Sequence, residues 1–224
     1  MLHFFRFDKE VDEQMRSIRK YLVASMNGVV SSGLKHLGYK LSYGVSLMRI
    51  KELSARFTGS SKLARCLWHS GCREMMIMAT YLQPVDEFTE KEALSWLKEC
   101  KNMELAEQLS RNLCSRLPFA DSLLIKLKDE NSSEYMKAFA YILASLQVKK
   151  EGAQASFLSA YEEKAMVDVY SQSSAVYSGV SRFLKELCNL DADKMRKFAN
   201  ELDAAKGPGA AWVREEMLTV LDFG

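Results

Sequence analysis

Apolar residues recur along this chain at intervals of three or four, a spacing that places them on one face of an α-helix. Between residues 102 and 116, for example, Leu105, Leu109 and Leu113 form such a stripe. No stretch alternates apolar and polar residues in the way that a half-buried β-strand does. The pattern therefore predicts an all-α protein of about ten or eleven helices, each roughly 8–17 residues long and joined by short connections.

Helix starts are marked by residues whose side-chain oxygens accept hydrogen bonds from the free N–H groups of a first turn. Thr89 and Glu92 have the spacing of a capping box. The other predicted caps are Asp8, Ser46, Asn102, Ser132 or Ser133, and Asp191. The expected helices include approximately residues 29–37, 102–116, 119–128, 155–170, 174–188, 192–203 and 210–221, with a linker at 206–209.

The order of the predicted helices bears on the architecture. They recur as pairs about every 35–45 residues, which is typical of a right-handed α-α superhelix, the HEAT-like repeat solenoid. We therefore expect residues 1–224 to form a single repeat domain. A compact helix bundle has the same apolar periodicity, so the pattern alone leaves that alternative open.

The segment 96–116 holds the most suggestive polar residues. Asn102 is a predicted N-cap, which places Glu104 and Glu107 in the first turns, where the helix dipole favours negative charge. Met103 and Glu107 are four residues apart and share one face. A carboxylate beside an apolar side chain at a helix start is one form of binding or catalytic site. An ordinary capped and solvated helix end gives the same pattern, and the spacing alone favours that second interpretation.

Composition and charge narrow the class of protein. Of the 224 residues, 48% are hydrophobic and 27% are charged, which suits a globular fold with an ample core. The net charge is only +2, but residues 1–150 carry 23 Lys and Arg against 17 Asp and Glu, whereas residues 151–224 carry 8 against 12. A basic first two-thirds is compatible with a nucleic-acid partner.

The potential metal ligands are scattered. The five cysteines form no C-x-x-C pair, and His3, His36 and His69 lie far apart, so we expect reduced thiols, no metal site and no cofactor. No apolar run approaches the length of a membrane span. The N-terminal residues mix aromatic and charged side chains and are not typical of a signal peptide. We therefore expect a cytoplasmic protein with no membrane partner.

Short motifs in the first half of the chain carry a specific resemblance. They are Tyr43-Gly44-Val45-Ser46, Arg49-Ile50, Leu63-Ala64, Leu67-Trp68-His69-Ser70 and Arg73-Glu74. Together they resemble the DNA alkylation repair family, the AlkD-like DNA glycosylases built from HEAT-like repeats. The resemblance spans nearly the whole chain in length and helix order. It implies a superhelix whose concave, basic face holds duplex DNA.

The resemblance also implies a reaction and its substrates. The family acts on N3- and N7-alkylated purines, which are cationic and therefore already good leaving groups. As the bond to the sugar breaks, the sugar gains oxocarbenium character, and a nearby carboxylate stabilises that charge or orients water. Aromatic faces add attraction for the cationic base.

The family's site residues match five positions of this chain. Glu107 matches the essential aspartate and is the candidate catalytic residue, whereas Glu104 matches another aspartate and is the weaker candidate. Met103 and Arg182 stand where the family has tryptophans, and Lys137 stands where it has an arginine. We expect Lys137 to hold a phosphate and to keep Glu107 ionised. The charge pattern is kept, while both aromatic rings are lost.

Three interpretations of function follow. The first is a DNA-binding relative in which excision of N3- or N7-alkylated purines is weakened, altered or absent. The second is a working glycosylase that uses Glu107 and Lys137, and the third is a non-catalytic HEAT-like scaffold for protein partners. Basic residues gathered on one face would favour the first two. For these we expect a monomer that binds duplex DNA through Met103, Lys137, Arg182, Lys101 and Arg49.

Overall fold

The computed structural model describes residues 8–129, 132–203 and 206–224. These residues contain thirteen α-helices, more than the ten or eleven predicted, and three short 3-10 helices. Within them strand-like pairing is limited to a single bridge between Leu41 and Cys72. The N-terminal stretch, with His3, lies outside the described residues.

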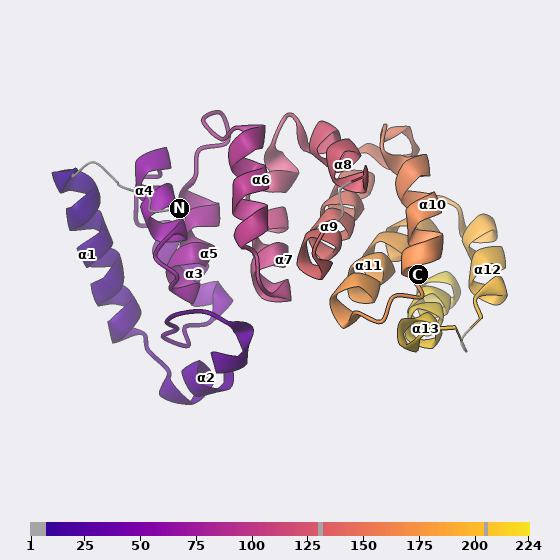
Figure 1. Cartoon of the computed structure of the whole chain (residues 1–224), viewed down its shortest axis with the longest axis horizontal. Helices are drawn as coiled ribbons and strands as arrows, with labels where there is room; N and C mark the ends of the chain where they lie inside the picture. Colours follow the sequence, from indigo (N-terminus) through magenta and orange to yellow (C-terminus); the bar gives the residue numbers. More distant parts are fainter. Residues whose placement is uncertain (1–7, 130–131, 204–205) are drawn as a thin grey trace. The chain divides into compact units, whose positions relative to one another are not determined.

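The chain divides into two compact units, Met1–Trp96 and Leu97–Gly224, which are described separately below. The single repeat domain predicted for residues 1–224 stays a prediction. The first unit contains α1 (Lys9–Ala24), α2 (Gly28–Gly33), η1 (Lys35–Leu37), α3 (Leu47–Ser54), α4 (Ser61–Trp68) and α5 (Arg73–Leu82) (Figure 1). The next helix, α6 (Glu90–Glu99), begins in the first unit and ends in the second.

The second unit is also built of helices joined by short connections (Figure 1). They are α7 (Met103–Asn112), η2 (Cys114–Arg116), α8 (Ala120–Asp129), α9 (Glu134–Glu151), η3 (Gly152–Gln154), α10 (Leu158–Asp168), α11 (Ser174–Leu190), α12 (Ala192–Glu201) and α13 (Pro208–Phe223).

Local sequence signals locate several of the helix starts. Thr89 and Glu92 form the predicted capping box, because each backbone N–H donates to the other residue's side chain. The predicted caps are confirmed where a side-chain oxygen accepts a hydrogen bond from the N–H three residues later, at Asp8, Ser46, Asn102, Ser133 and Asp191.

Three predicted boundaries are wrong. The helix expected at 29–37 is split into α2 and η1, which share Leu34 as a boundary residue. The helix expected at 102–116 stops at Asn112, because Leu113 leaves the helical region at φ −125° and ψ −62°. The expected linker 206–209 contains the start of α13, where Pro208 suits the first turn because its missing N–H would have no partner there.

A buried ion pair fixes the loop that precedes α3 in the first unit. The Glu74 carboxylate is fully buried and accepts hydrogen bonds from the backbone N–H groups of Tyr43 at 3.0 Å and Val45 at 3.2 Å. It also accepts one from Arg73 at 3.0 Å. Between these two N–H groups Gly44 adopts φ +70°, and a Cβ there would lie 2.2 Å from a backbone oxygen. The Arg73-Glu74 motif is therefore a structural element of this unit.

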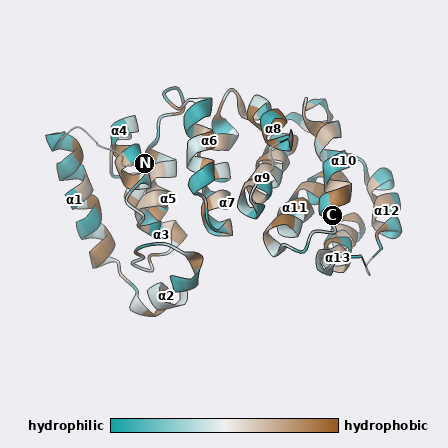
Figure 2. Ribbon diagram, viewed as in Figure 1, coloured by the Kyte–Doolittle hydropathy of each residue, from teal (hydrophilic) through white to brown (hydrophobic). Residues whose placement is uncertain are grey.

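In the second unit α9 lies between α7 and α11, and α11 in turn packs against α13 (Figure 1). Most residues of α9 are buried, which is the pattern of a helix enclosed by its neighbours. The surrounding helices carry hydrophobic and hydrophilic residues side by side, as amphipathic helices do (Figure 2). This row of helices places residues from α7, α9 and α11 near one another although they are far apart in sequence.

Candidate functional site

The start of α7 is fixed by its cap. The Asn102 side chain accepts a hydrogen bond from the N–H of Leu105 at 2.8 Å and is itself buried. Leu105 and Leu109 are buried against the core of the unit. Because the buried face is fixed in this way, Glu107 lies on a partly open side of the helix, with its side chain 24% exposed.

The Glu107 carboxylate is held by two arginines. Its Oε1 accepts hydrogen bonds from Arg182 Nη1 at 2.6 Å and from Arg111 Nε at 2.9 Å, and its Oε2 accepts one from Arg182 Nη2 at 3.0 Å. The contact with Arg182 is therefore bidentate, a geometry that gives charge-assisted hydrogen bonds both strength and direction. We call these three residues the arginine–glutamate cluster. It joins α7 to α11.

The charge of the cluster follows from its contacts. Burial would raise the pKa of the Glu107 carboxyl, but the hydrogen bonds and charges of Arg182 and then of Arg111 outweigh it, so the pKa lies below the usual 4.5. Glu107 is therefore ionised at neutral pH. Two guanidinium groups and one carboxylate leave the cluster with a net positive charge.

Contacts with α9 set the positions of the two helices that carry the cluster. On α7, the Ser110 hydroxyl contacts both the Ala106 carbonyl at 2.9 Å and the Phe139 carbonyl of α9 at 3.3 Å. On α11, Gly179 lies so close to α9 that an added Cβ would be 3.1 Å from the Cα and the oxygen of Ala138. Arg182 follows Gly179 by one helical turn, so this close approach brings its side chain within reach of α7.

Lys137 has a different partner from the one expected. Its Nζ lies 3.7 Å from Asp168 Oδ1, and the Tyr141 hydroxyl donates to Asp168 Oδ2 at 2.9 Å. Burial raises the pKa of Tyr141, so this hydroxyl stays protonated and donates. The expectation that Lys137 keeps Glu107 ionised is therefore wrong, because Arg182 and Arg111 do so. The physical reason is helix packing, because the close approach of α11 to α9 at Gly179 brings Arg182 to α7, while Lys137 pairs with Asp168 at the end of α10.

The remaining predicted residues lie at varied degrees of exposure. Lys101 is exposed just before α7, whereas Met103 and Glu104 are half-buried in its first turn. Arg49 belongs to the first unit, where its Nη1 lies 2.9 Å from Glu52 Oε2. Of the candidates in the second unit, the structure brings Glu107 and Arg182 into direct contact. Arg111 was missed, although a glutamate followed four residues later by an arginine is a readable helix pair.

The described residues were searched for metal-binding clusters and for membrane-spanning helices. They contain no group of three or more His, Cys, Asp and Glu side chains that could hold a metal ion. No described helix is both long enough and apolar enough to cross a membrane. Four of the five free cysteines are buried, and Cys66 is half-buried.

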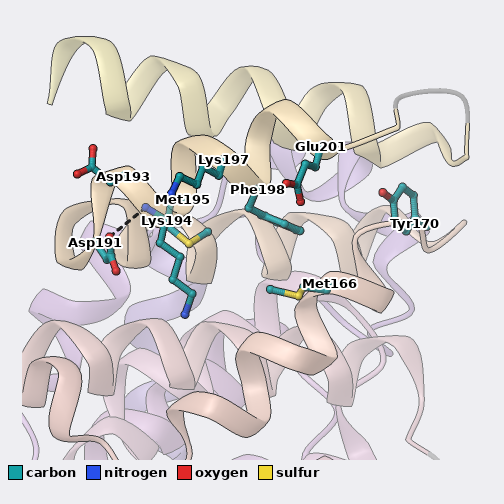
Figure 3. Close-up of a pocket in the computed structure, with 9 residues that line it drawn as sticks. All are labelled: Met166, Tyr170, Asp191, Asp193, Lys194, Met195, Lys197, Phe198 and Glu201. Carbon is teal, nitrogen blue, oxygen red and sulfur yellow. Dashed lines mark hydrogen bonds between the residues drawn. The ribbon is translucent and has the colours of Figure 1, made fainter.

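A separate pocket of about 590 Å³ lies beside α10 and α12 (Figure 3). Met166, Tyr170 and Phe198 give it apolar and aromatic surface. Its remaining lining residues are mixed in charge, with Lys194 and Lys197 beside Asp191, Asp193 and Glu201. Asp191 is committed to capping α12, as the dashed line in Figure 3 marks. Opposite charges therefore offset each other in the lining of this pocket.

Two of three comparisons with known proteins found a match. The model of a family described as "DNA alkylation repair enzyme" matches residues 19–215. Among solved structures, the chain is similar to a protein described as belonging to "a new family of proteins related to the HEAT-like repeat DNA glycosylases with affinity for branched DNA structures". The TM-score is 0.73 at 15% sequence identity, with 83% of this chain and 82% of that chain covered. This likeness confirms the predicted all-α, HEAT-like repeat fold. A search of curated proteins gave no significant match.

Proposed function

Because this chain belongs to the DNA alkylation repair enzyme family, we propose that it binds DNA through the phosphate backbone, with base excision weakened or lost. One observation carries this proposal: both oxygens of Glu107, the residue matched to the family's essential aspartate, are already bound by guanidinium groups. We further propose that it acts as a cytoplasmic monomer.

The electrostatics of the cluster oppose glycosylase chemistry. A carboxylate stabilises an oxocarbenium ion when it faces the developing positive charge in a site of low dielectric constant. Here Arg182 and Arg111 surround the carboxylate, so a cation forming nearby would meet a net positive cluster and be repelled. Met103 and Arg182 also provide no aromatic ring for a cationic base.

The same charges favour binding to a DNA backbone. Residues 1–150 carry 23 basic against 17 acidic residues, among them the exposed Arg111 of the cluster, and Arg182 on α11 contributes a further, partly exposed guanidinium group. The similar solved protein is described as having affinity for branched DNA. We therefore expect binding to duplex and branched DNA with little sequence preference. Contacts to phosphates release counterions, so the affinity should fall steeply as salt rises.

Two assays on the same protein preparation test this proposal. The first measures release of 7-methylguanine and 3-methyladenine from methylated duplex DNA. The second titrates a fluorescein-labelled duplex and a labelled four-way junction at low and at physiological salt. We expect salt-dependent binding of both DNAs and no release above the level of Glu107→Gln. Release that Glu107→Gln abolishes would contradict the loss of excision, and an absence of binding at low salt would contradict the DNA-binding role.

A second candidate function is a scaffold for a protein partner. It is favoured by apolar side chains exposed in the first unit, where Val29 is 85% and Met48 75% exposed. Large apolar side chains left in water often mark interaction surfaces. This alternative predicts that neither DNA binds at low salt, so the titration above separates the two candidates.

A further inference from the structure

We infer that Arg111 and Arg182 together form a binding site for one DNA backbone phosphate, with Glu107 as the residue that holds both guanidinium groups in place. This inference rests on the proposed function, because the ligand is the phosphodiester group of bound DNA. It reverses the role of the carboxylate, which becomes a positioning residue instead of a catalytic one.

The first argument concerns hydrogen-bond donors that are still available. Arg111 gives one N–H of its guanidinium group to Glu107, and Arg182 gives two. An arginine has about five N–H donors and no acceptor, so both groups keep further donors. Among the described residues, the Nη groups of Arg111 have no hydrogen-bond partner. The side chains of Arg111 and Arg182 are 47% and 34% exposed, so a ligand can reach them.

The second argument concerns charge and geometry. Two guanidinium groups repel each other, and the shared carboxylate offsets that repulsion while orienting both of them. The cluster keeps a net positive charge, which attracts an anion. Planar guanidinium groups match the oxygens of a phosphate through paired hydrogen bonds. Groups that are already oriented lose less side-chain entropy on binding than free arginines do.

Two other ion pairs among the described residues of the second unit lack this combination. Lys137 is a point charge that pairs with Asp168 at 3.7 Å, which leaves that pair neutral. Arg196 pairs one-to-one with Asp222 at 2.7 Å, and their side chains are 44% and 47% exposed. That pair also joins an arginine to a carboxylate on a neighbouring helix, but it has no second arginine. It therefore supplies a matched control.

The decisive test removes one positive and one negative charge from the cluster, so the net charge of the protein stays the same. The double variant Glu107→Gln with Arg182→Met removes one negative and one positive charge and keeps side-chain size. The control variant Arg196→Met with Asp222→Asn makes the same exchange on α12 and α13. Each protein is titrated with a labelled 20-bp duplex and a labelled four-way junction over a range of salt concentrations, and its thermal unfolding is recorded.

If the cluster binds a phosphate, the double variant should bind both DNAs about 10-fold more weakly, and the slope of log affinity against log salt should fall by about one. The control should bind within about 2-fold of the parent. Equal affinity and slope for parent and double variant would overturn the inference while leaving the DNA-binding proposal intact. If the parent itself binds neither DNA, the proposed function fails, and the inference fails with it.

A second variant keeps the test decisive if the double variant unfolds. Arg182→Lys preserves the charge but removes the planar fork, so it separates phosphate geometry from net charge. We expect a loss of affinity of about 3-fold or more with an unchanged melting temperature. Parent-like affinity in Arg182→Lys would overturn the inference.

Discussion

Glu74 in the first unit and Glu107 in the second are both paired with arginine, yet their surroundings differ. Glu74 is fully buried, and two of its donors are backbone N–H groups of one loop. Glu107 is partly exposed, and its donors are the side chains of Arg111 and Arg182. The first arrangement fixes the backbone and leaves nothing for a ligand.

The second arrangement fixes only side chains and keeps guanidinium donors at the surface. The same pair of residue types therefore serves the fold in one unit and a candidate binding site in the other. Burial and the identity of the donors decide between the two roles, which a residue match alone does not show.

The largest expected effect is on stability and follows from breaking the buried pair. Glu74→Gln keeps the shape of the side chain but removes its charge, which leaves the buried guanidinium of Arg73 uncompensated. We expect a loss of about 3–5 kcal/mol in the free energy of unfolding. Urea titration followed by circular dichroism measures it.

The matched substitution at the exposed cluster should cost far less. Glu107→Gln is expected to lower the free energy of unfolding by about 1 kcal/mol or less, because water screens both arginines. Similar losses for the two variants would show that burial does not separate these pairs.

The next largest effect is expected on base excision and tests whether the arginine–glutamate cluster blocks that reaction. The triple variant Met103→Trp, Glu107→Asp and Arg182→Trp restores the family residue at three of the five matched positions and removes the bidentate partner of the carboxylate. We expect release of 7-methylguanine from methylated duplex DNA to rise on the order of 100-fold above the parent, the scale of a well-placed charge in a transition state. High-performance liquid chromatography of the released bases measures it.

The control for this gain keeps Arg182. The double variant Met103→Trp with Glu107→Asp has the aromatic ring and the shorter carboxylate but retains the opposing guanidinium. It should release little more than the parent. If it gains as much as the triple variant, Arg182 does not block the carboxylate, and the electrostatic argument against excision is wrong.

The sequence predictions are right where the interacting residues lie close together in the sequence and fail where they lie far apart. Asp8, Asn102 and Asp191 were identified as caps because a cap and its N–H partner lie three residues apart. The bond between Glu107 and Arg182 joins residues 75 positions apart, and it depends on both α7 and α11 packing against α9. No local sequence pattern predicts that packing.

The family resemblance has the same limit, because matched positions do not show which distant side chains contact each other. The resemblance seen in the sequence places Glu107, Lys137 and Arg182 at one site without giving their pairing, and the predicted ion pair joins Glu107 to Lys137. The close approach of α11 to α9 at Gly179 brings Arg182 within hydrogen-bond distance of Glu107. Helix ends were missed for a related reason, because Leu113 departs from helical geometry within an unbroken apolar stripe.

The smallest expected effect is a pH dependence that reports the arginines directly. The pKa of Glu107 lies below 4.5 in the folded protein, so its contribution to stability is fully present above the ordinary glutamate pKa and is lost as pH falls through the lower, folded value. The difference in unfolding free energy between parent and Glu107→Gln should be about 1 kcal/mol or less at pH 7 and should shrink towards zero at pH values well below 4.5.

Repeating the comparison in an Arg182→Met background identifies the cause of this pH dependence. Burial alone raises the pKa of Glu107, and the arginines reverse that direction. The loss of stability on adding Glu107→Gln to Arg182→Met should therefore be smaller at pH 7 than the loss on adding it to the parent. Urea titrations at several pH values measure both losses. If the stability lost by Glu107→Gln in the parent instead grew as the pH fell, burial would outweigh the guanidinium groups, and the carboxylate would be less firmly held than its three hydrogen bonds indicate.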